Sequence, residues 1–490
     1  MRRTQDPQFR FKQLDLEQVE LDLNCRHEMT PILAALIEIH LNHRKALNRI
    51  LSWIESDVLG TKKKGRGCPG MDYWEILVLA SVRLGCNLDY DQLTDLANNH
   101  HALRLVMGVD GWGSEEDRFR RSTIHQNLVK LKTETVEAIR DEIARIGHTL
   151  LPKAIESVRG DGFVVETNIH YPTDTSLMVD GLRVMLRLVS RMCERLDLPG
   201  WRQHNHLLNR GRSVLRKIQK AGRAKKKDRL RCLYSDLLDH LRSIQERVLR
   251  SVRQAEAQLD SLDYITRLEI EQYIAELNAF LLATEHVCQL AYRRVFLEEK
   301  IPNSEKIFSL FEIHTQLINR GKSPLPYEFG RHVFIVEDKA GFILTSRILE
   351  PGQVEMDIVV PTMQDLQLQY ENKIRSASFD KGSSSKNNLR DLREILDVAC
   401  VPRKGRRTQE DIAFESDDAF RKARRRHPGI ESAIHALVDG NGLDRCRDTT
   451  ELGFRRYVAL ATLGRNLHSL GKIVLRRLKK RRNAQQAQLN

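Results

Sequence analysis

The sequence predicts an α/β domain that is preceded by an all-helical region and interrupted by a second helical block. Residues 28–150 carry apolar positions at helical spacing. Residues 158–169 instead read VRGDGFVVETNI, which is β-rich and alternates like a strand. Helical patterns return over 175–300, and strands and helices then alternate toward the end of the chain. This order indicates one sheet whose first strand is separated from the others by the helical block.

In the N-terminal region, a helix is predicted over 72–84 and ends at Gly85. A short helix is predicted over 91–98, and Ser122 is placed as the N-cap of a third. This arrangement resembles a helix-turn-helix, although an ordinary helical bundle with polar outer faces has the same pattern. The positions expected to be exposed to a DNA groove are Thr123, His125, Gln126, Lys130 and Lys132.

The helical block carries a regular apolar repeat. Between 237 and 281, apolar residues recur about every 3.5 positions, which predicts long antiparallel helices. Two interpretations stay open: a coiled-coil-like interface between subunits, or packing within the block, which we prefer.

The remaining elements complete the α/β order. Strands are predicted at 332–337 and 342–349, joined as a hairpin by the turn at 338–341. The elements that follow are a helix near 362–373, a strand at 374–379, a helix over 386–396, a strand at 398–401, and helices over 417–438 and 451–480.

The balance of charge points to a polyanionic partner. The 490 residues include 80 Lys+Arg and 66 Asp+Glu, a formal net charge of +14. The positive charge is concentrated in blocks, which favours nucleic acid, and these blocks lack the apolar faces needed for insertion at a membrane surface. The blocks are KKKGR at 62–66, the arm at 202–231, RKGRR at 403–407, RKARRR at 421–426 and RRLKKRR at 476–482.

Several classes of protein are not expected. No apolar run approaches the length of a membrane span, and the first residues, MRRTQDPQFRFKQ, contain no apolar core of a secretory signal. The eight cysteines fall singly, with no CxxC pair, which argues against a disulfide scaffold and a structural zinc site. We therefore expect a cytoplasmic protein with reduced thiols.

Three carboxylates stand where strands or a helix can bring them together. Asp161 lies on the first strand, Asp380 follows a later strand, and Glu431 lies on a helix. Carboxylates in such places can converge on hard divalent cations, and two Mg²⁺ ions can activate a nucleophile and stabilise the leaving oxygen of a phosphodiester. The pattern alone does not single these three out among 66 acids. Tolerable rivals are Asp174, Asp439 and Glu451.

A resemblance sharpens this choice. The segment DGFVVETNIHYPTDTSLMVDGLR, which begins at Asp161, resembles the first catalytic block of bacterial insertion-sequence transposases of the DDE class. The closest likeness is to the ISNCY-type group, the insertion sequences not classified elsewhere. Other similar blocks follow in order: the N-terminal GMDYWEILVLASVRLGCNLDYDQLTDLANNHHALRLVMGVD, then KIFSLFEIHTQLINRGKSPLPYEFGRHVFIVED at 306–338, SFDKGSSSKNN at 378–388, GIESAIHALVDGNGLDRCRD at 429–448 and GFRRYVALATLGRNLHSLGK at 453–472.

The resemblance implies a domain plan with an RNase H-like catalytic core. It comprises an all-α DNA-binding domain at 28–150, the first core strand at 156–174, an all-α insertion at 175–305, the rest of the core at 306–475 and a basic tail at 476–490.

The resemblance also implies an activity. A transposase of this class binds the terminal inverted repeats of its element, cleaves the strands and joins the 3′ ends to target DNA. Asp161, Asp380 and Glu431 match the catalytic triad, which would bind two Mg²⁺ or Mn²⁺ ions. The expected partners are double-stranded DNA and further copies of the chain, with no membrane, in a bacterial cytoplasm and at the nucleoid when DNA is bound.

The basic residues receive roles within this plan. The expected DNA contacts are Thr123, His125, Gln126 and Lys130 in the helical domain, Lys225, Lys226 and Lys227 in the basic arm, and Arg424, Arg425 and Arg426 beside the glutamate.

The sequence departs from the family at three positions. The usual Asp-Arg-Gly-aromatic pattern reads Asp380-Lys381-Gly382-Ser383, and the position of a superfamily lysine is Val438. These departures leave open a catalytically impaired, transposase-derived DNA-binding protein. A metal-dependent nuclease without strand transfer would share the carboxylates and is a second alternative.

Overall fold

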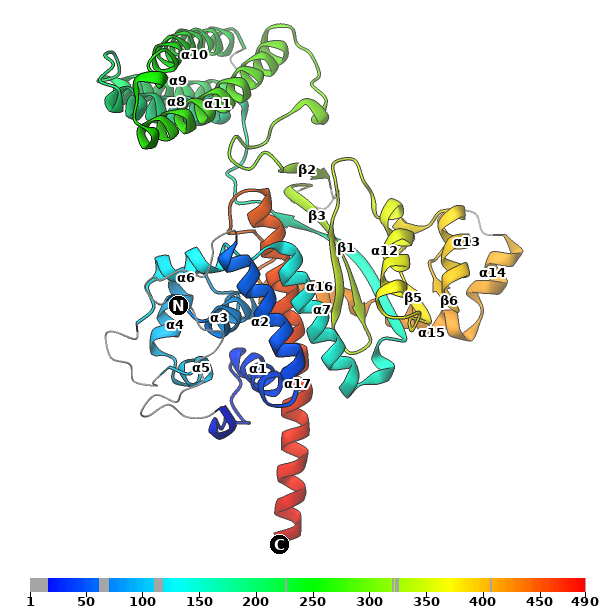
Figure 1. Cartoon of the computed structure of the whole chain (residues 1–490). Coiled ribbons are helices and arrows are strands. Elements are labelled where there is room, and N and C mark those ends of the chain that lie inside the picture. The colour runs from blue at the N-terminus through cyan, green and yellow to red at the C-terminus, as the bar shows by residue number, and fades with distance from the viewer. Residues whose placement is uncertain are drawn as a thin grey trace. The chain divides into compact units, whose positions relative to one another are not determined.

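The computed structural model divides into two compact units, Met1–Asn168 with Gly330–Asn490, and Ile169–Phe329 (Figure 1). Each unit has its own hydrophobic core. The residues that the structure describes are 16–60, 70–109, 118–224, 227–319, 321, 326–405 and 408–489.

The N-terminal part of the first unit is helical, as the apolar spacing predicts. Its helices are α1 (Met29–Asn42), α2 (Arg44–Leu59), α3 (Tyr73–Gly85), α4 (Tyr90–Asn99), α5 (His101–Met107), α6 (Arg121–Leu128) and α7 (Thr133–Leu150). A reciprocal capping box between Asp72 and Glu75 starts α3. The prediction that Ser122 caps α6 is wrong, because the helix begins two residues earlier than this cap requires, with Arg120 as its extended N-cap.

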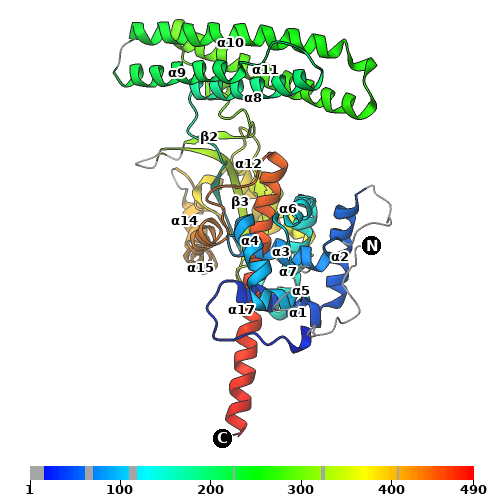
Figure 2. The same cartoon turned by 90° about the vertical axis from the view of Figure 1, so that its left-hand side faces the viewer.

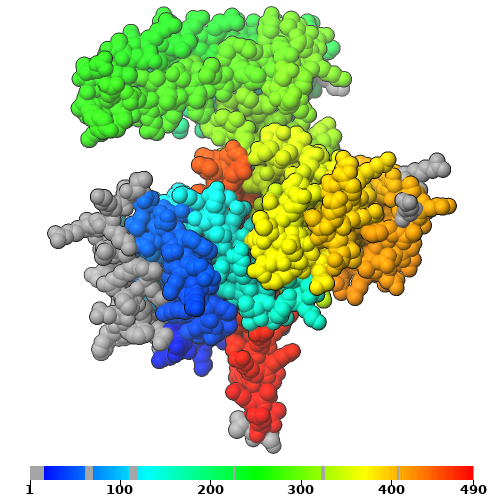
Figure 3. Space-filling model, turned by 45° about the vertical axis from the view of Figure 1, so that its right-hand side comes forward, coloured from blue at the N-terminus to red at the C-terminus, as the bar shows by residue number. Residues whose placement is uncertain are grey.

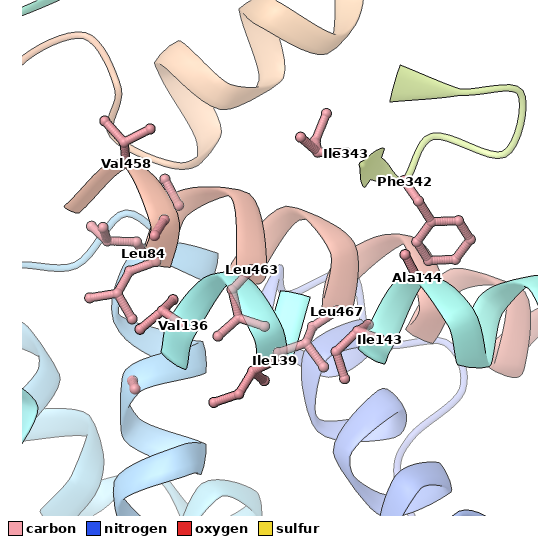
Figure 4. Close-up of a cluster of buried hydrophobic side chains, with 14 of the residues drawn as sticks. Leu84, Val136, Ile139, Ile143, Ala144, Phe342, Ile343, Val458, Leu463 and Leu467 are labelled. Carbon is pink, nitrogen blue, oxygen red and sulfur yellow. The ribbon is translucent and has the colours of Figure 1, made fainter. Parts of the chain in front are cut away.

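The last helix, α17 (Glu451–Leu489), holds this unit together. It packs against α1, α3 and α7 and against the strand β4 (Ile343–Ile348), so it runs between the N-terminal helices and the sheet (Figures 1 and 2). Glycines permit the close crossing, because a Cβ on Gly464 would lie 2.6 Å from the backbone of Gly85. Leu463 and Leu467 join α3 and α7 in one buried cluster (Figure 4). Residues 28–150 therefore share their core with the sheet and are not a compact unit of their own.

The sheet is mixed and has six strands. They are β1 (Ser157–Glu166), β2 (Gln316–Asn319), β3 (Tyr327–Asp338), β4, β5 (Ser376–Ser378) and β6 (Val398–Cys400), ordered β2-β3-β1-β5-β6 with β4 also paired to β3. The β1–β3 and β3–β4 pairs are antiparallel, whereas β1–β5 and β5–β6 are parallel. The predicted hairpin is confirmed as β3 and β4, and the molecule is an α/β protein in which helices predominate.

Two helix predictions in this region need correction. The helix expected near 362–373 is α12 (Glu355–Gln369), which starts earlier and contains Pro361. Burial of Ile358, Val359 and Met363 stabilises the turns on both sides of the proline. The helix expected over 417–438 is broken at Pro428 into α15 (Asp418–Arg426) and α16 (Gly429–His435), with a π-helical turn at Ala436–Gly440. The other helices here are α13 (Lys386–Ile395) and α14 (Gln409–Glu415).

The second unit is a bundle of four long helices. They are α8 (Asp174–Arg195), α9 (His204–Arg223), α10 (Lys227–Glu256) and α11 (Tyr264–Phe296). The apolar repeat lies mostly inside this bundle, since Leu237, Ile244 and Leu277 are buried in its core. Ile265, by contrast, is 75% exposed. The interpretation as internal packing is therefore confirmed for most of the repeat.

No helix of the described residues combines the length and apolar character required to cross a bilayer. The cysteines in the same part of the chain are all free thiols.

A buried ion pair connects the N-terminal helices to the segment that precedes α17. Arg83 donates to Asp448 through both terminal nitrogens, at 3.1 and 2.5 Å, and the two side chains are 1% and 7% exposed. Arg83 also lies 4.0 Å from the ring centre of Tyr90. A charge buried this deeply depends on its partner, because water cannot replace it.

We predict that Asp448→Ala lowers the free energy of unfolding by about 3–5 kcal/mol, since it leaves Arg83 buried without its carboxylate. Urea denaturation measures this change. The matched control is Asp397→Ala, whose ion pair with Arg375 is largely exposed on both sides. That variant should lose less than about 1 kcal/mol. Equal losses in the two variants would show that the buried pair has no special role.

Candidate active site

The register of β1 against β5 brings two of the predicted carboxylates together. Arg159 pairs with Ser378, the last residue of β5. Asp161 lies two residues after Arg159 in β1, and Asp380 lies two residues after Ser378, just beyond the end of β5. Neighbouring strands of a sheet lie roughly 4.8 Å apart. Beyond this point β1 has a different partner on that side: Glu166 exchanges backbone hydrogen bonds with Asp444 and Cys446. The two aspartates therefore stand where β5 leaves the sheet.

Asp380 is held by the turn that follows it. Its Oδ1 accepts hydrogen bonds from the backbone N–H groups of Gly382, at 2.6 Å, and Ser383, at 3.3 Å. A Cβ on Gly382 would lie 2.8 Å from the same oxygen, so a glycine is needed there. Ser383 is fully buried.

Glu431 reaches the site from the first turn of α16, which packs against β1. Its side chain is exposed. Arg159, two residues before Asp161 and on the same strand face, donates to the carbonyl oxygen of Arg426 at 3.0 Å. Its guanidinium group also occupies the space that a Cβ on Gly429 would need. Arg159 therefore fixes the corner from which α16 presents Glu431.

Electrostatics show that these groups act on one another. The pKa of Asp161 is raised to about 6, mainly by burial and additionally by the neighbouring carboxylates of Glu355, Asp380 and Glu431, against a hydrogen bond from the Gly162 N–H. The structure thus brings together all three sequence-predicted carboxylates and adds a fourth. None of the rivals Asp174, Asp439 and Glu451 is among the groups that shift the pKa of Asp161 most.

Glu355 was missed by the sequence analysis. It begins α12, its Oε1 lies 3.2 Å from His332 Nε2, and its side chain is 15% exposed. A Cβ on Gly162 would lie 2.1 Å from Glu355 Oε1, so the glycine after Asp161 clears the space for this carboxylate. Gly162, the small residue beside Asp161, was the one signal in the sequence for a neighbouring side chain. Glu355 was overlooked because the helix that it begins was expected to start after Pro361.

His427 is a second residue that the sequence analysis missed. It lies at the corner between α15 and α16, with Nδ1 3.3 Å from Ser378 Oγ. Burial lowers the pKa of this imidazole, although Asp380 and Glu431 oppose the shift. A neutral imidazole at this corner can donate or accept one hydrogen bond next to the carboxylates.

The donor set suits a hard cation, but no tight metal cage is formed. Among the described residues, no group of three His, Cys, Asp or Glu side chains is gathered closely enough to hold a metal ion. The carboxylates supply oxygen ligands only, and three of them add to the raised pKa of Asp161 that burial causes. Mg²⁺ typically uses few protein oxygens and keeps several waters, so an open carboxylate cluster fits it.

The predicted DNA-binding residues fall in different places. On and after α6, which packs against α3 and α4, His125, Gln126 and Lys130 are exposed and Thr123 is half-buried. The His125 ring packs edge-on against Tyr90, 4.8 Å between centres.

The other predicted basic contacts divide between the two units. Arg424, Arg425 and Arg426 form the exposed last turn of α15, next to the corner that holds Glu431. Lys227 is exposed at the start of α10, in the second unit. Lys225, Lys226 and the basic block at 62–66 lie outside the described residues.

Comparison with known proteins identifies no relative. No protein-family model, no curated protein and no solved structure matches the chain.

We predict that Asp161→Asn stabilises the protein in the absence of divalent cations. The raised pKa of Asp161 means that its ionisation opposes folding, so the wild-type stability should fall as the pH rises from about 4 to about 6. Asparagine removes this cost, which is about 3 kcal/mol at neutral pH. Urea unfolding in a chelator, repeated across this pH range, measures both effects.

The exposed control Asp397→Asn should keep the pH dependence of the wild type. If Asp161→Asn instead destabilises the protein at pH 7, the carboxylate is a structural group and not part of a charge-crowded site.

Proposed function

We propose that the protein is a DNA transposase of the DDE class, with Asp161, Asp380 and Glu431 as its catalytic carboxylates. The observation that carries the proposal is their convergence from three separate segments, since each of the other two contributes to raising the pKa of Asp161. Two of them, Asp161 and Asp380, each lie two residues after the paired residues Arg159 and Ser378 of adjacent parallel strands. Like charges repel, so surface acids without a function are not expected to cluster in this way. Functional sites, by contrast, commonly contain such like-charged clusters.

The sheet supports this proposal. Along the order β4-β3-β1-β5-β6, the first three strands are antiparallel and the last two are parallel to β1. Helix α12 follows β4, and helix α13 joins β5 to β6. This is the arrangement expected of an RNase H-like core. The four-helix unit lies in sequence between β1 and β3, where the proposed insertion belongs.

In the proposed mechanism, Asp161 and Asp380 supply oxygen ligands to divalent cations, and Glu431 and Glu355 add further carboxylate oxygens. Bound Mg²⁺ or Mn²⁺ would activate the attacking oxygen and stabilise the leaving oxygen of the phosphodiester. Gly382 and Ser383 orient Asp380 through their N–H groups. Arg424, Arg425 and Arg426, exposed beside this corner, would hold the DNA backbone near the carboxylates.

The remaining expectations belong to the same proposal. The residues of α6 would contact the terminal repeats, and Lys225, Lys226 and Lys227 of the basic arm would contact phosphates. Synapsis of two element ends requires more than one copy of the chain. The protein would act in a bacterial cytoplasm, at the nucleoid when bound.

The departures from the family pattern bear on activity. Val438 is half-buried in the π-helical turn, so no charged side chain takes the place of the superfamily lysine. This observation favours the catalytically impaired, transposase-derived DNA-binding protein as the second candidate.

We predict that Asp161→Asn, Asp380→Asn and Glu431→Gln each reduce cleavage of the element's ends in Mg²⁺ by about a thousandfold or more, because each removes a cation ligand. Binding of the same DNA should change less than about threefold, since phosphate contacts carry most of the affinity. Gel analysis of cut and joined products, with binding measured in parallel, tests both statements.

Asp439→Asn, which alters an exposed acid on the same segment as Glu431, is the control and should keep full activity. Cutting by Asp161→Asn at near the wild-type rate would refute the assignment. Cut but never joined products would indicate the nuclease, and binding with neither product the impaired derivative.

We further predict that His125, Gln126 and Lys130, changed together to Ala in the full chain, reduce the preference for the terminal repeat over random DNA. Each lost base contact should cost about 1–3 kcal/mol. Competition binding with the two DNAs measures the preference. An unchanged preference would place sequence recognition outside α6.

A further inference from the structure

A row of basic side chains runs along one face of α17. Arg465, His468, Lys472 and Arg476 are spaced three, four and four residues apart, so they stack on the same side of the helix. Arg465 and His468 are half-buried, whereas Lys472 and Arg476 are exposed. The end of α17, in red, projects from the rest of the first unit (Figure 3). We call the three cations among these side chains, Arg465, Lys472 and Arg476, the α17 cation row.

The α17 cation row lacks sufficient counter-charge. The Nε of Arg465 is buried and has no hydrogen-bond acceptor among the described residues. The carboxylate that acts on Arg465 is Glu337, which already accepts hydrogen bonds from Arg159 at 2.9 and 2.6 Å. Burying a cation without a dedicated partner is costly, so the position needs a reason other than stability.

The members of the row also repel one another. The pKa of His468 is lowered to about 4, mainly by burial and additionally by Lys472 and Arg465, so this imidazole is neutral at pH 7. Burial likewise lowers the pKa of Lys472, and Arg465 and Arg476 add to the shift. An anion along this face would relieve the crowding.

The row leads toward the candidate active site. Glu337 lies beside Arg465, and its partner Arg159 lies two residues before Asp161 on the same face of β1. Arg159 also donates to the carbonyl oxygen of Arg426, next to the exposed arginines of α15. Positive groups therefore continue from α17 to the corner that holds Glu431.

We propose that the α17 cation row binds successive phosphates of a DNA duplex and guides one strand to the active site. From Arg465 to Arg476 the helix rises about 16 Å, which suits a linear polyanion better than a single phosphate group. The inference rests on the proposed function and adds the path by which the DNA substrate is held.

The test compares two triple variants of the full chain. Arg465→Gln, Lys472→Gln and Arg476→Gln together remove three charges from the row. The control, Lys373→Gln, Arg375→Gln and Arg390→Gln, removes three exposed charges that each have a carboxylate partner. Binding of a duplex is measured in a chelator over a range of salt concentrations, for terminal-repeat and random DNA.

The row variant should flatten the slope of log affinity against log salt by up to about 3 units, roughly 0.9 for each lost phosphate contact. The loss should be equal for the two DNAs, because phosphates carry no sequence information. The control should keep the wild-type slope. A row variant whose slope matches the wild type, with DNA binding intact, would overturn this inference and leave the proposed function standing.

A second measurement separates binding from a structural role. Arg465→Gln alone should raise the urea midpoint of unfolding while it weakens DNA binding, because it removes a buried charge with no dedicated partner. A lowered midpoint together with normal affinity would identify Arg465 as a structural residue and refute its part in the row. Wild-type protein that binds no duplex DNA at low salt would instead refute the proposed function itself.

Discussion

The candidate site depends on a parallel strand pair that is only three residues long. Ser157, Val158 and Arg159 of β1 pair with Ser376, Ala377 and Ser378 of β5. This register brings Asp161 and Asp380 to the same level just as β5 ends. A slip of one residue would turn one of the two side chains to the opposite face of the sheet. The longer antiparallel pairing of β1 with β3 supports the short pair, since it holds β1 in place from the other side.

The first unit concentrates uncompensated charge of both signs. Carboxylates crowd around Asp161, and cations crowd along α17, with Arg159 and Glu337 between them. Each group alone costs stability, because charges of one sign are held close together and partly away from water. In the proposed function, divalent cations would offset the carboxylates, and DNA phosphates would offset the cations of α17. Binding of this substrate would then recover part of the free energy that the like-charged groups cost the folded protein.

The predictions from the sequence are confirmed where the pattern behind them is local. The hairpin of β3 and β4, the helix α13 and the buried repeat of the second unit follow from alternation, helical spacing and turn residues. The predictions are wrong where packing overrides a local rule. Pro361 suggested a helix start, but buried neighbours continue the helix through it and place Glu355 beside Gly162. The apolar spacing predicted one continuous helix over 417–438. Pro428 breaks this helix, and the break orients Glu431.

The sequence by itself determined that the protein is basic and that strands and helices alternate around a helical block, and the order of its motifs carries the resemblance that singles out Asp161, Asp380 and Glu431. Those properties are contained in composition, periodicity and the order of motifs. Only the tertiary structure decided that Glu355 and His427 join them, and that α17 unites the N-terminal helices with the sheet. Such groupings depend on strand register and side-chain packing between segments far apart in the chain, which no local pattern encodes.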